Sequence, residues 1–125
     1  MQIHIAGYVH QDIKPDNFLI SSKDHKVRVI DLGIMTELMN NGVHKALAKH
    51  GFQGTPSYAS IKALEGFTLS RRDDLECLAY TIMYLYDPSK IPWAGFTTKN
   101  EIYRLKLQFL ETPESQLPSY KFIGL

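Results

Sequence analysis

Cysteine is nearly absent from this sequence, and its scarcity limits the classes of protein to consider. Cys77 is the single cysteine among 125 residues. One thiol cannot form a disulfide within the chain, which excludes a small secreted fold held by several disulfides. Cys77 also lies within an apolar helical pattern, which favours a buried structural thiol over a reactive one. Because a secretory signal is missing too, we expect a protein of the cytoplasm or the nucleus.

The sequence also lacks an excess of charge of either sign and a long apolar run. The formal net charge is +1, which argues against broad electrostatic binding of nucleic acid or of an anionic membrane. No window of about 18 apolar residues occurs, so no segment is predicted to span a bilayer. Apolar residues nevertheless make up 44% of the chain, as is typical of a globular domain. The length is sufficient for one domain.

The first half of the chain predicts a short β-hairpin and then an irregular segment. Apolar side chains at 18–20 and within 27–30 flank a run of turn residues, which indicates two antiparallel strands. Residues 35–53 have mixed polarity and contain glycine and asparagine breakers, so we expect a long, mobile loop with one helical turn. The apolar-rich residues 1–9 are compatible with the end of a helix.

The clearest helix is predicted over residues 72–86, where apolar side chains recur at helical spacing. Ser70 is the expected N-cap, Asp73 its reciprocal partner and Pro88 the stop. Because the apolar stripe is nearly continuous, we expect this helix in the middle of a domain. The residues expected to form the stripe are Leu75, Leu78, Ala79, Ile82, Met83 and Tyr86.

A second helix is predicted over residues 99–110, with Thr98 as its cap and Glu101 in the reciprocal position. Pro113 and Pro118 are expected to interrupt the segment that follows. The apolar face of this helix is expected to consist of Ile102, Leu105, Phe109 and Leu110.

A concentration of polar residues precedes the first predicted strand. The stretch HQDIKPDN at 10–17 contains Asp12, Lys14 and Asn17, and Asp31 follows the second strand. An aspartate on a loop can accept a proton from a hydroxyl, and a lysine can neutralise a phosphoryl group. Carboxylate and amide oxygens are ligands that Mg²⁺ prefers. Phosphoryl transfer needs this combination of a base, cations and accurate positioning.

Each of these residues also has a structural interpretation. Taken alone, Asp12 and Asn17 are typical turn or cap residues. His10 is more often a core histidine bonded to backbone than a catalyst, and we assign it no chemistry. Asp31 alone is weak evidence, since Asp-x-Gly is a common sequence. Their order along the chain, together with Lys14, favours a site over coincidence.

The motifs, taken in order, resemble those of eukaryotic protein kinases. HQDIKPDN is similar to the catalytic loop of that family, and IDLGI at 30–34 is similar to its metal-binding segment. Further along, GTPSYAS, SRRDDLECLAYTIMYLY and IPWAGF resemble the casein kinase I group. This group carries Tyr-Ala-Ser-Ile where most kinases carry Ala-Pro-Glu, and residues 58–61 read Tyr-Ala-Ser-Ile. The resemblance covers nearly the whole chain.

The resemblance implies transfer of the γ-phosphoryl group of ATP to serine or threonine hydroxyls of proteins. Asp12 would be the catalytic base, and Lys14 would contact the transferred phosphoryl group. Asn17 and Asp31 would bind Mg²⁺ and, with Lys14, would form the cofactor site. Thr55 would hydrogen-bond near Asp12 and Lys14 and help to select hydroxyl substrates.

Two further residues receive a supporting role from the resemblance. Asp74 would lie on the central helix and anchor the catalytic loop from below. Trp93 would pack the loop that follows this helix.

The implied fold is mainly α (α+β): the large C-terminal lobe of a kinase, with a short β-hairpin carrying the catalytic loop. Residues 1–125 would form one partial kinase domain. The sequence has no Gly-rich phosphate loop and no strand lysine with a glutamate partner, so we expect a fragment, or a product that needs a missing N-lobe or a partner chain. ATP binding by the chain alone would then be weak, because one wall buries little of the adenine. Apolar surface on the central helix would also be exposed.

Three residues depart from the pattern of the family. Gln11 stands where arginine is usual, and a neutral amide cannot pair strongly with a phosphate, so we expect no phosphorylation-driven activation through position 11. Ser57 replaces an arginine that helps casein kinase I members to bind an anion beside the substrate, so a preference for acidic or pre-phosphorylated substrates stays open. Leu32 replaces a phenylalanine and remains apolar.

Other classes of function compete with the kinase hypothesis. A non-catalytic scaffold or binding module is the main alternative, and the motifs after position 55 argue against a small-molecule phosphotransferase. Protein substrates and ATP are the expected partners, with no nucleic acid and no membrane. The substrate protein, oligomeric state and pathway have no signature in the sequence. The basic residues His44, Lys45, Lys49 and His50 fit a solvated loop face better than an anion site.

Overall fold

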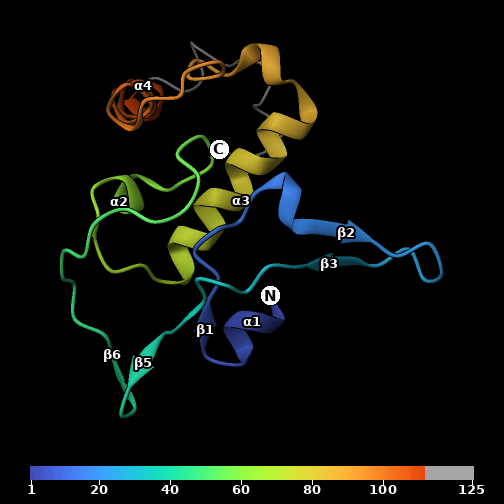
Figure 1. The fold of residues 1–125 in the computed structure, drawn as a ribbon, viewed down its shortest axis with the longest axis vertical. Coiled ribbons are helices and arrows are strands. Elements are labelled where there is room, and N and C mark those ends of the chain that lie inside the picture. The colour runs from blue at the N-terminus through green and yellow to red at the C-terminus, as the bar shows by residue number, and fades with distance from the viewer. Residues whose placement is uncertain (112–125) are drawn as a thin grey trace.

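The computed structural model describes residues 1–111, which are mainly helical with short antiparallel strands (Figure 1). The helices are α1 (Gln2–Ile5), α2 (Ile61–Leu64), α3 (Arg71–Tyr86) and α4 (Lys99–Glu111), with 3₁₀ turns η1 (Pro15–Asn17) and η2 (Pro88–Lys90). The strands are β1 (Tyr8–Val9), β2 (Phe18–Ile20), β3 (Val27–Val29), β4 (Thr36–Glu37), β5 (Met39–Asn40) and β6 (Val43–His44). None of the described helices is long and apolar enough to cross a bilayer. Pro113 and Pro118 lie outside the described residues.

The predicted β-hairpin is confirmed. β2 and β3 pair antiparallel, with Phe18 opposite Val29 and Ile20 opposite Val27. In the turn, the Asp24 carboxylate accepts hydrogen bonds from the backbone N–H of Lys26 at 3.1 Å and from the Arg28 guanidinium at 2.9 Å. The hairpin lies beside α3 in Figure 1 and extends away from it. It therefore brings the residues before β2 and after β3 to the same end of one sheet.

The expected helical turn within residues 35–53 is wrong, because this segment forms short strands. β4 pairs antiparallel with β1, and β5 pairs antiparallel with β6. Asn41 and Gly42 connect β5 and β6 with φ angles of 51° and 78°. Two successive left-handed residues make the tight turn that suits the twist of a hairpin, and Asn-Gly is the preferred pair. The Asn-Gly pair therefore indicates a hairpin rather than a helix breaker.

Helix α3 agrees closely with the prediction at both ends. It begins at Arg71, one residue before the expected start, and ends at Tyr86 before Pro88. The Asp73 carboxylate accepts hydrogen bonds from the Ser70 backbone N–H at 2.8 Å and from the Ser70 hydroxyl at 3.3 Å. The predicted reciprocal contact at the helix start is therefore confirmed.

The predicted burial of α3 is only partly correct. Leu75, Ile82 and Tyr86 were expected in the core, yet their exposed fractions are 54%, 42% and 54%. Met83 is buried as expected, but the other buried residues lie on the opposite face: Asp73, Asp74, Cys77, Tyr80 and Thr81. Because this buried face carries polar side chains as well as Cys77 and Tyr80, the apolar periodicity of α3 does not indicate which side faces the rest of the described chain.

The main core lies between the second half of α3, α2 and α4. Trp93 is fully buried at its centre, with the Tyr80 ring 5.2 Å and the Phe109 ring 5.5 Å away in edge-to-face geometry. Such aromatic pairs add about 1 kcal/mol each beyond the burial of their surface. The other buried members are Ala59, Ala63, Leu64, Met83, Ile91 and Ile102.

Helix α4 confirms the predicted second helix but not its whole apolar face. Ile102 and Phe109 are buried as expected, whereas Leu110 is 49% exposed. The position between them on the buried face is taken by Lys106, which is 0% exposed. A lysine at this position was not anticipated, because lysine is rarely buried completely.

Candidate active site

Three of the predicted site residues contact one another. The Lys14 ammonium donates a hydrogen bond to the Thr55 hydroxyl at 2.9 Å, and that hydroxyl donates to Asp12 Oδ1 at 3.2 Å. Lys14 Nζ also lies 3.5 Å from Asp12 Oδ2. Lys14 and Asp12 remain partly open to solvent, with side-chain exposures of 22% and 17%. The fold therefore joins the 10–17 stretch to a threonine that is distant in sequence, and the arrangement is accessible to a substrate.

His10 is a structural residue, as the sequence analysis expected. It is fully buried. Its Nδ1 accepts a hydrogen bond from the Asp12 backbone N–H at 3.1 Å, and its Nε2 lies 3.0 Å from the Ile30 carbonyl oxygen. A neutral imidazole with its hydrogen on Nε2 satisfies both contacts. His10 thus joins the loop that carries Asp12 to the segment that carries Asp31.

Asn17 makes a second connection between the same two segments. Its side-chain amide nitrogen donates to the Asp12 carbonyl oxygen at 2.8 Å, and its backbone carbonyl accepts from the Ile30 N–H at 2.8 Å. The residue is 4% exposed. These bonds orient the amide, so that its nitrogen faces the loop and its oxygen is the atom suited to a cation.

Asp31 stands in an unusual backbone conformation directly after the hairpin. Its φ angle is 58°, and its carboxylate accepts a hydrogen bond from the Gly33 N–H at 3.2 Å. A Cβ atom added at Gly33 would lie 3.1 Å from Asp31 Oδ1. Left-handed conformations are uncommon outside glycine and cluster at functional sites. A side chain at 33 would therefore have to displace the Asp31 carboxylate slightly, and the carboxylate itself is exposed.

The donor set formed by Asn17 and Asp31 suits Mg²⁺ in kind but is small. One carboxylate and one amide oxygen are hard ligands of the type that Mg²⁺ prefers. Within residues 1–111 no group of three or more histidine, cysteine, aspartate or glutamate side chains is placed to hold a metal ion. Two such residues would supply only part of the ligands of a cation, and water and phosphate oxygens would supply the others, as is usual for Mg²⁺ beside nucleotides.

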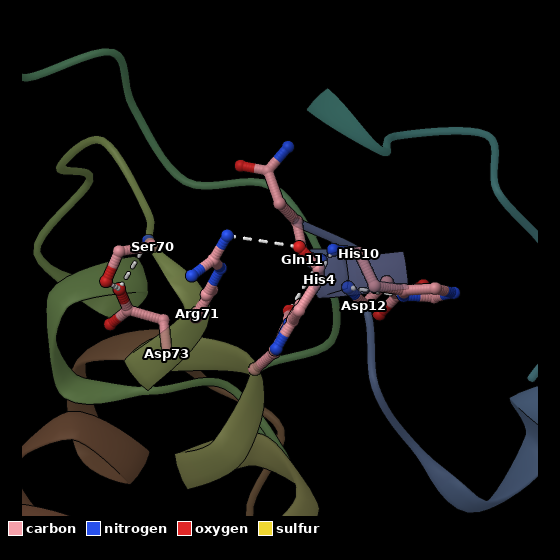
Figure 2. A network of polar contacts seen from close by, with 8 residues as sticks. His4, His10, Gln11, Asp12, Ser70, Arg71 and Asp73 are labelled. Carbon is pink, nitrogen blue, oxygen red and sulfur yellow. Dashed lines mark hydrogen bonds and ion pairs between the residues drawn. The ribbon is translucent and has the colours of Figure 1, made fainter. Parts of the chain in front are cut away.

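Asp74 anchors the loop that carries Asp12, as predicted. It is fully buried in the first turns of α3 and accepts hydrogen bonds from the backbone N–H groups of His10 at 2.7 Å and Gln11 at 2.8 Å. His4 Nε2 lies 2.8 Å from the same carboxylate. Figure 2 shows His4, His10 and Gln11 gathered beside the start of α3, where the Arg71 guanidinium also donates to the His4 carbonyl oxygen at 3.1 Å. One carboxylate therefore fixes two successive loop amides.

Gln11 connects the loop that carries Asp12 to the segment after Asp31. Its φ angle is 72°, and its side-chain amide donates a hydrogen bond to the Ile34 carbonyl oxygen. A neutral amide is well suited to a carbonyl partner, and the absence of phosphorylation-driven activation through position 11 stays a prediction. Gln11 also lines a pocket of about 190 Å³ with Lys45 and His50, two of the four basic residues expected on a solvated loop face.

The segment that carries Thr55 is held by side chains from two later elements. The Trp93 indole N–H donates to the Ser57 carbonyl oxygen at 2.9 Å. Lys106 Nζ donates to the carbonyl oxygens of Pro56 at 2.9 Å and Ala59 at 2.6 Å. Sequence reasoning missed Lys106. The available signal was a lysine spaced four residues from Ile102 and three from Phe109 on an apolar face.

Lys106 lies in a setting that disfavours its charged form. Burial lowers its pKa to about 7, although Cys77 and Glu76 act in the opposite direction. The rings of Tyr80 and Trp93 lie with their centroids 4.4 Å and 5.2 Å from Nζ. Burial also raises the pKa of the neighbouring Cys77 thiol to about 12 and raises that of Tyr80.

The free energy of unfolding is expected to rise with pH between about 7 and 8.5. In this range the unfolded chain keeps a proton on Lys106, whose ordinary pKa is 10.5, while the folded chain releases it. Each pH unit contributes at most about 1.4 kcal/mol, so the gain is about 2 kcal/mol. Above about pH 9 the buried Cys77 and Tyr80 oppose the trend, since they ionise in the unfolded chain first. Urea unfolding at several pH values measures the effect. Lys106→Met should remove the slope, and a slope unchanged in that variant would contradict the assignment.

Comparison with known proteins agrees with this geometry. A family model described as "Protein kinase domain" matches residues 1–120. The chain is 38% identical over 122 residues to casein kinase 1-like protein HD16 of Oryza sativa subsp. japonica, an alignment that covers 90% of this chain and 17% of that protein. The chain thus spans less than a fifth of the length of this relative. The chain belongs to the protein kinase family and, within it, is of the casein kinase I type.

Proposed function

We propose that the chain forms the large C-terminal lobe of a serine/threonine kinase of the casein kinase I type. In this proposal residues 1–125 are part of one kinase domain, which acts on proteins in the cytoplasm or the nucleus. The observation that carries the proposal is the contact of Thr55 with both Asp12 and Lys14. Phosphoryl transfer to a hydroxyl needs a base and a cation held at a fixed separation, and Thr55 holds both.

The chain's own residues would divide the work as follows. Asp12 accepts the proton of the substrate hydroxyl and orients that hydroxyl for attack. Thr55 donates its hydrogen to Asp12 Oδ1, which would leave Oδ2, 3.5 Å from Lys14 Nζ, to accept the proton of the substrate hydroxyl. Lys14 lies beside that carboxylate and stabilises the negative charge of the phosphoryl group as it transfers.

Asn17 and Asp31 would hold Mg²⁺, and Lys14 would complete the contacts to ATP. A bound ion would supply positive charge that neutralises the phosphate groups. His10 and Asn17 keep the Asp31 segment in register with the loop of Asp12 through their bonds to Ile30. The base and the cation site would therefore move as one unit.

Transfer of ³²P from ATP to serine and threonine peptides tests the proposal. In a chimera, this chain replaces the matching stretch of a casein kinase 1-like protein, the host. The rate of phosphoryl transfer by the unmodified host is measured first. We expect the chimera to keep at least a tenth of the host rate, with phosphate on serine or threonine and not on tyrosine. A chimera that melts cooperatively but transfers less than a hundredth of the host rate would contradict the proposal.

A non-catalytic binding module is the second candidate function, and an exposed apolar face on α3 favours it. This face of α3 carries Leu75, Ile82, Leu85 and Tyr86, with exposed fractions of 42% to 69%. Apolar patches of this kind often mark an interaction surface. A folded but inactive chimera would support this second function over the first.

A further inference from the structure

Lys106 is a fully buried lysine whose contacts are with backbone and aromatic rings. Its Nζ donates to two carbonyl oxygens, those of Pro56 and Ala59, and lies over the rings of Tyr80 and Trp93. Removing an amine from water is unfavourable unless its hydrogen bonds are replaced. A methionine would fill the same space without that cost. The geometry thus points to the two carbonyl oxygens as the reason for a lysine at this position.

These carbonyls belong to the turn that presents Thr55. The N–H groups of Tyr58 and Ala59 both donate to the Thr55 carbonyl oxygen at 3.1 Å, which closes the turn on its inner side. Lys106 donates hydrogen bonds to the carbonyl oxygens of Pro56 and Ala59, and the Trp93 indole N–H donates to that of Ser57. These hydrogen bonds therefore reach the turn from both sides and restrain its backbone.

We propose that Lys106 is a positioning residue: from α4 it fixes the turn that directs Thr55 toward Asp12 and Lys14, and so sets the affinity for the hydroxyl-bearing protein substrate. The effect on substrate affinity rests on the proposed kinase function, whereas the restraint of the turn by Lys106 does not. Lys106 is buried and touches neither the phosphoryl group nor the base. Its effect on substrate passes through Thr55, which contacts both Asp12 and Lys14.

Amide hydrogen exchange in the chain tests the structural part. Lys106→Met keeps the apolar stem and removes the donor, and Arg104→Met is the control, since Arg104 is an exposed cation on the same helix. We expect the amides of Tyr58 and Ala59 to exchange at least tenfold faster in Lys106→Met, with those of β2 and β3 within twofold of wild type. Equal acceleration at all amides, or no change at Tyr58 and Ala59, would overturn the proposal.

A second measurement decides the case if Lys106→Met does not fold. Exchange in the wild-type chain is followed at increasing urea below the unfolding transition, which reveals segments that open together. If Lys106 joins the turn to α4, exchange of the Tyr58 and Ala59 amides should show the same urea dependence as exchange of the α4 amides. A turn that opens at lower urea, before α4, would overturn the proposal.

Kinetics in the chimera test the consequence for substrate. Lys106→Met should raise the KM for a peptide substrate at least fivefold and leave the KM for ATP within twofold, while Arg104→Met changes neither. A fall in kcat with an unchanged peptide KM would contradict the positioning role. If the wild-type chimera transfers no phosphate, the proposed function fails, whereas the exchange results still decide whether Lys106 holds the turn.

Discussion

Replacing Asp74 by alanine is expected to lower the free energy of unfolding by about 3–5 kcal/mol, the usual effect of removing one member of a buried charged contact. The substitution leaves the backbone N–H groups of His10 and Gln11 and the imidazole of His4 without their shared acceptor. Each is at or near the interior, so water replaces the lost bonds poorly. Asp74→Asn keeps the shape of the side chain but offers one acceptor oxygen. It should lower the free energy of unfolding by about half as much as Asp74→Ala.

Urea unfolding followed by circular dichroism measures this prediction. The control is Asp24→Asn in the exposed β2–β3 turn, where the carboxylate contacts Arg28 and where solvent screening leaves a surface ion pair with little effect on stability. A loss below about 1 kcal/mol for Asp74→Ala would show that the loop does not depend on this carboxylate.

Asp12→Asn is expected to lower the rate of phosphoryl transfer by 10²- to 10⁴-fold in the chimera, which is the usual contribution of a positioned base. An asparagine oxygen can still accept the Thr55 hydrogen bond, so the fold and the Lys14–Thr55 contact should persist. The KM for ATP should therefore change little. The loss would then report the chemistry of the carboxylate and not a loss of structure.

Single-turnover transfer of ³²P, with saturating ATP, measures the loss. Asp16→Asn is the matched control, because Asp16 is an exposed aspartate in the adjoining η1 turn. This control should stay within twofold of the parent. An Asp12→Asn protein that keeps more than a tenth of the parent rate would show that Asp12 is not the base.

The elements that could be predicted are those whose signal is local. The β2–β3 hairpin follows from two apolar runs around a polar turn, and α3 follows from a capping pair and a proline stop. The buried side of α3 could not be predicted, because it carries Asp73, Asp74 and Thr81 beside its apolar residues, and tertiary packing decides its burial. The β5–β6 hairpin was missed although Asn41-Gly42 is a strong local signal.

The candidate site divides in the same way. Asp12, Lys14 and Asn17 are close in sequence, so their grouping could be proposed from residue chemistry alone. Thr55 entered through the resemblance to casein kinase I, since nothing local shows that it reaches Lys14 across the fold. Lys106 was overlooked because its partners are carbonyl groups, which have no signature in a sequence. Contacts between a side chain and distant backbone depend wholly on tertiary structure.

Because Cys77 is buried, its reaction with an alkylating reagent can report how often the packing around α3 opens. The thiol is 4% exposed, and burial raises its pKa to about 12. Alkylating reagents react with the thiolate, so iodoacetamide can modify Cys77 only when the surrounding helix separates from its neighbours. Because the sequence has no second cysteine, the rate of alkylation gives the frequency of that event in unlabelled, native protein, without denaturant.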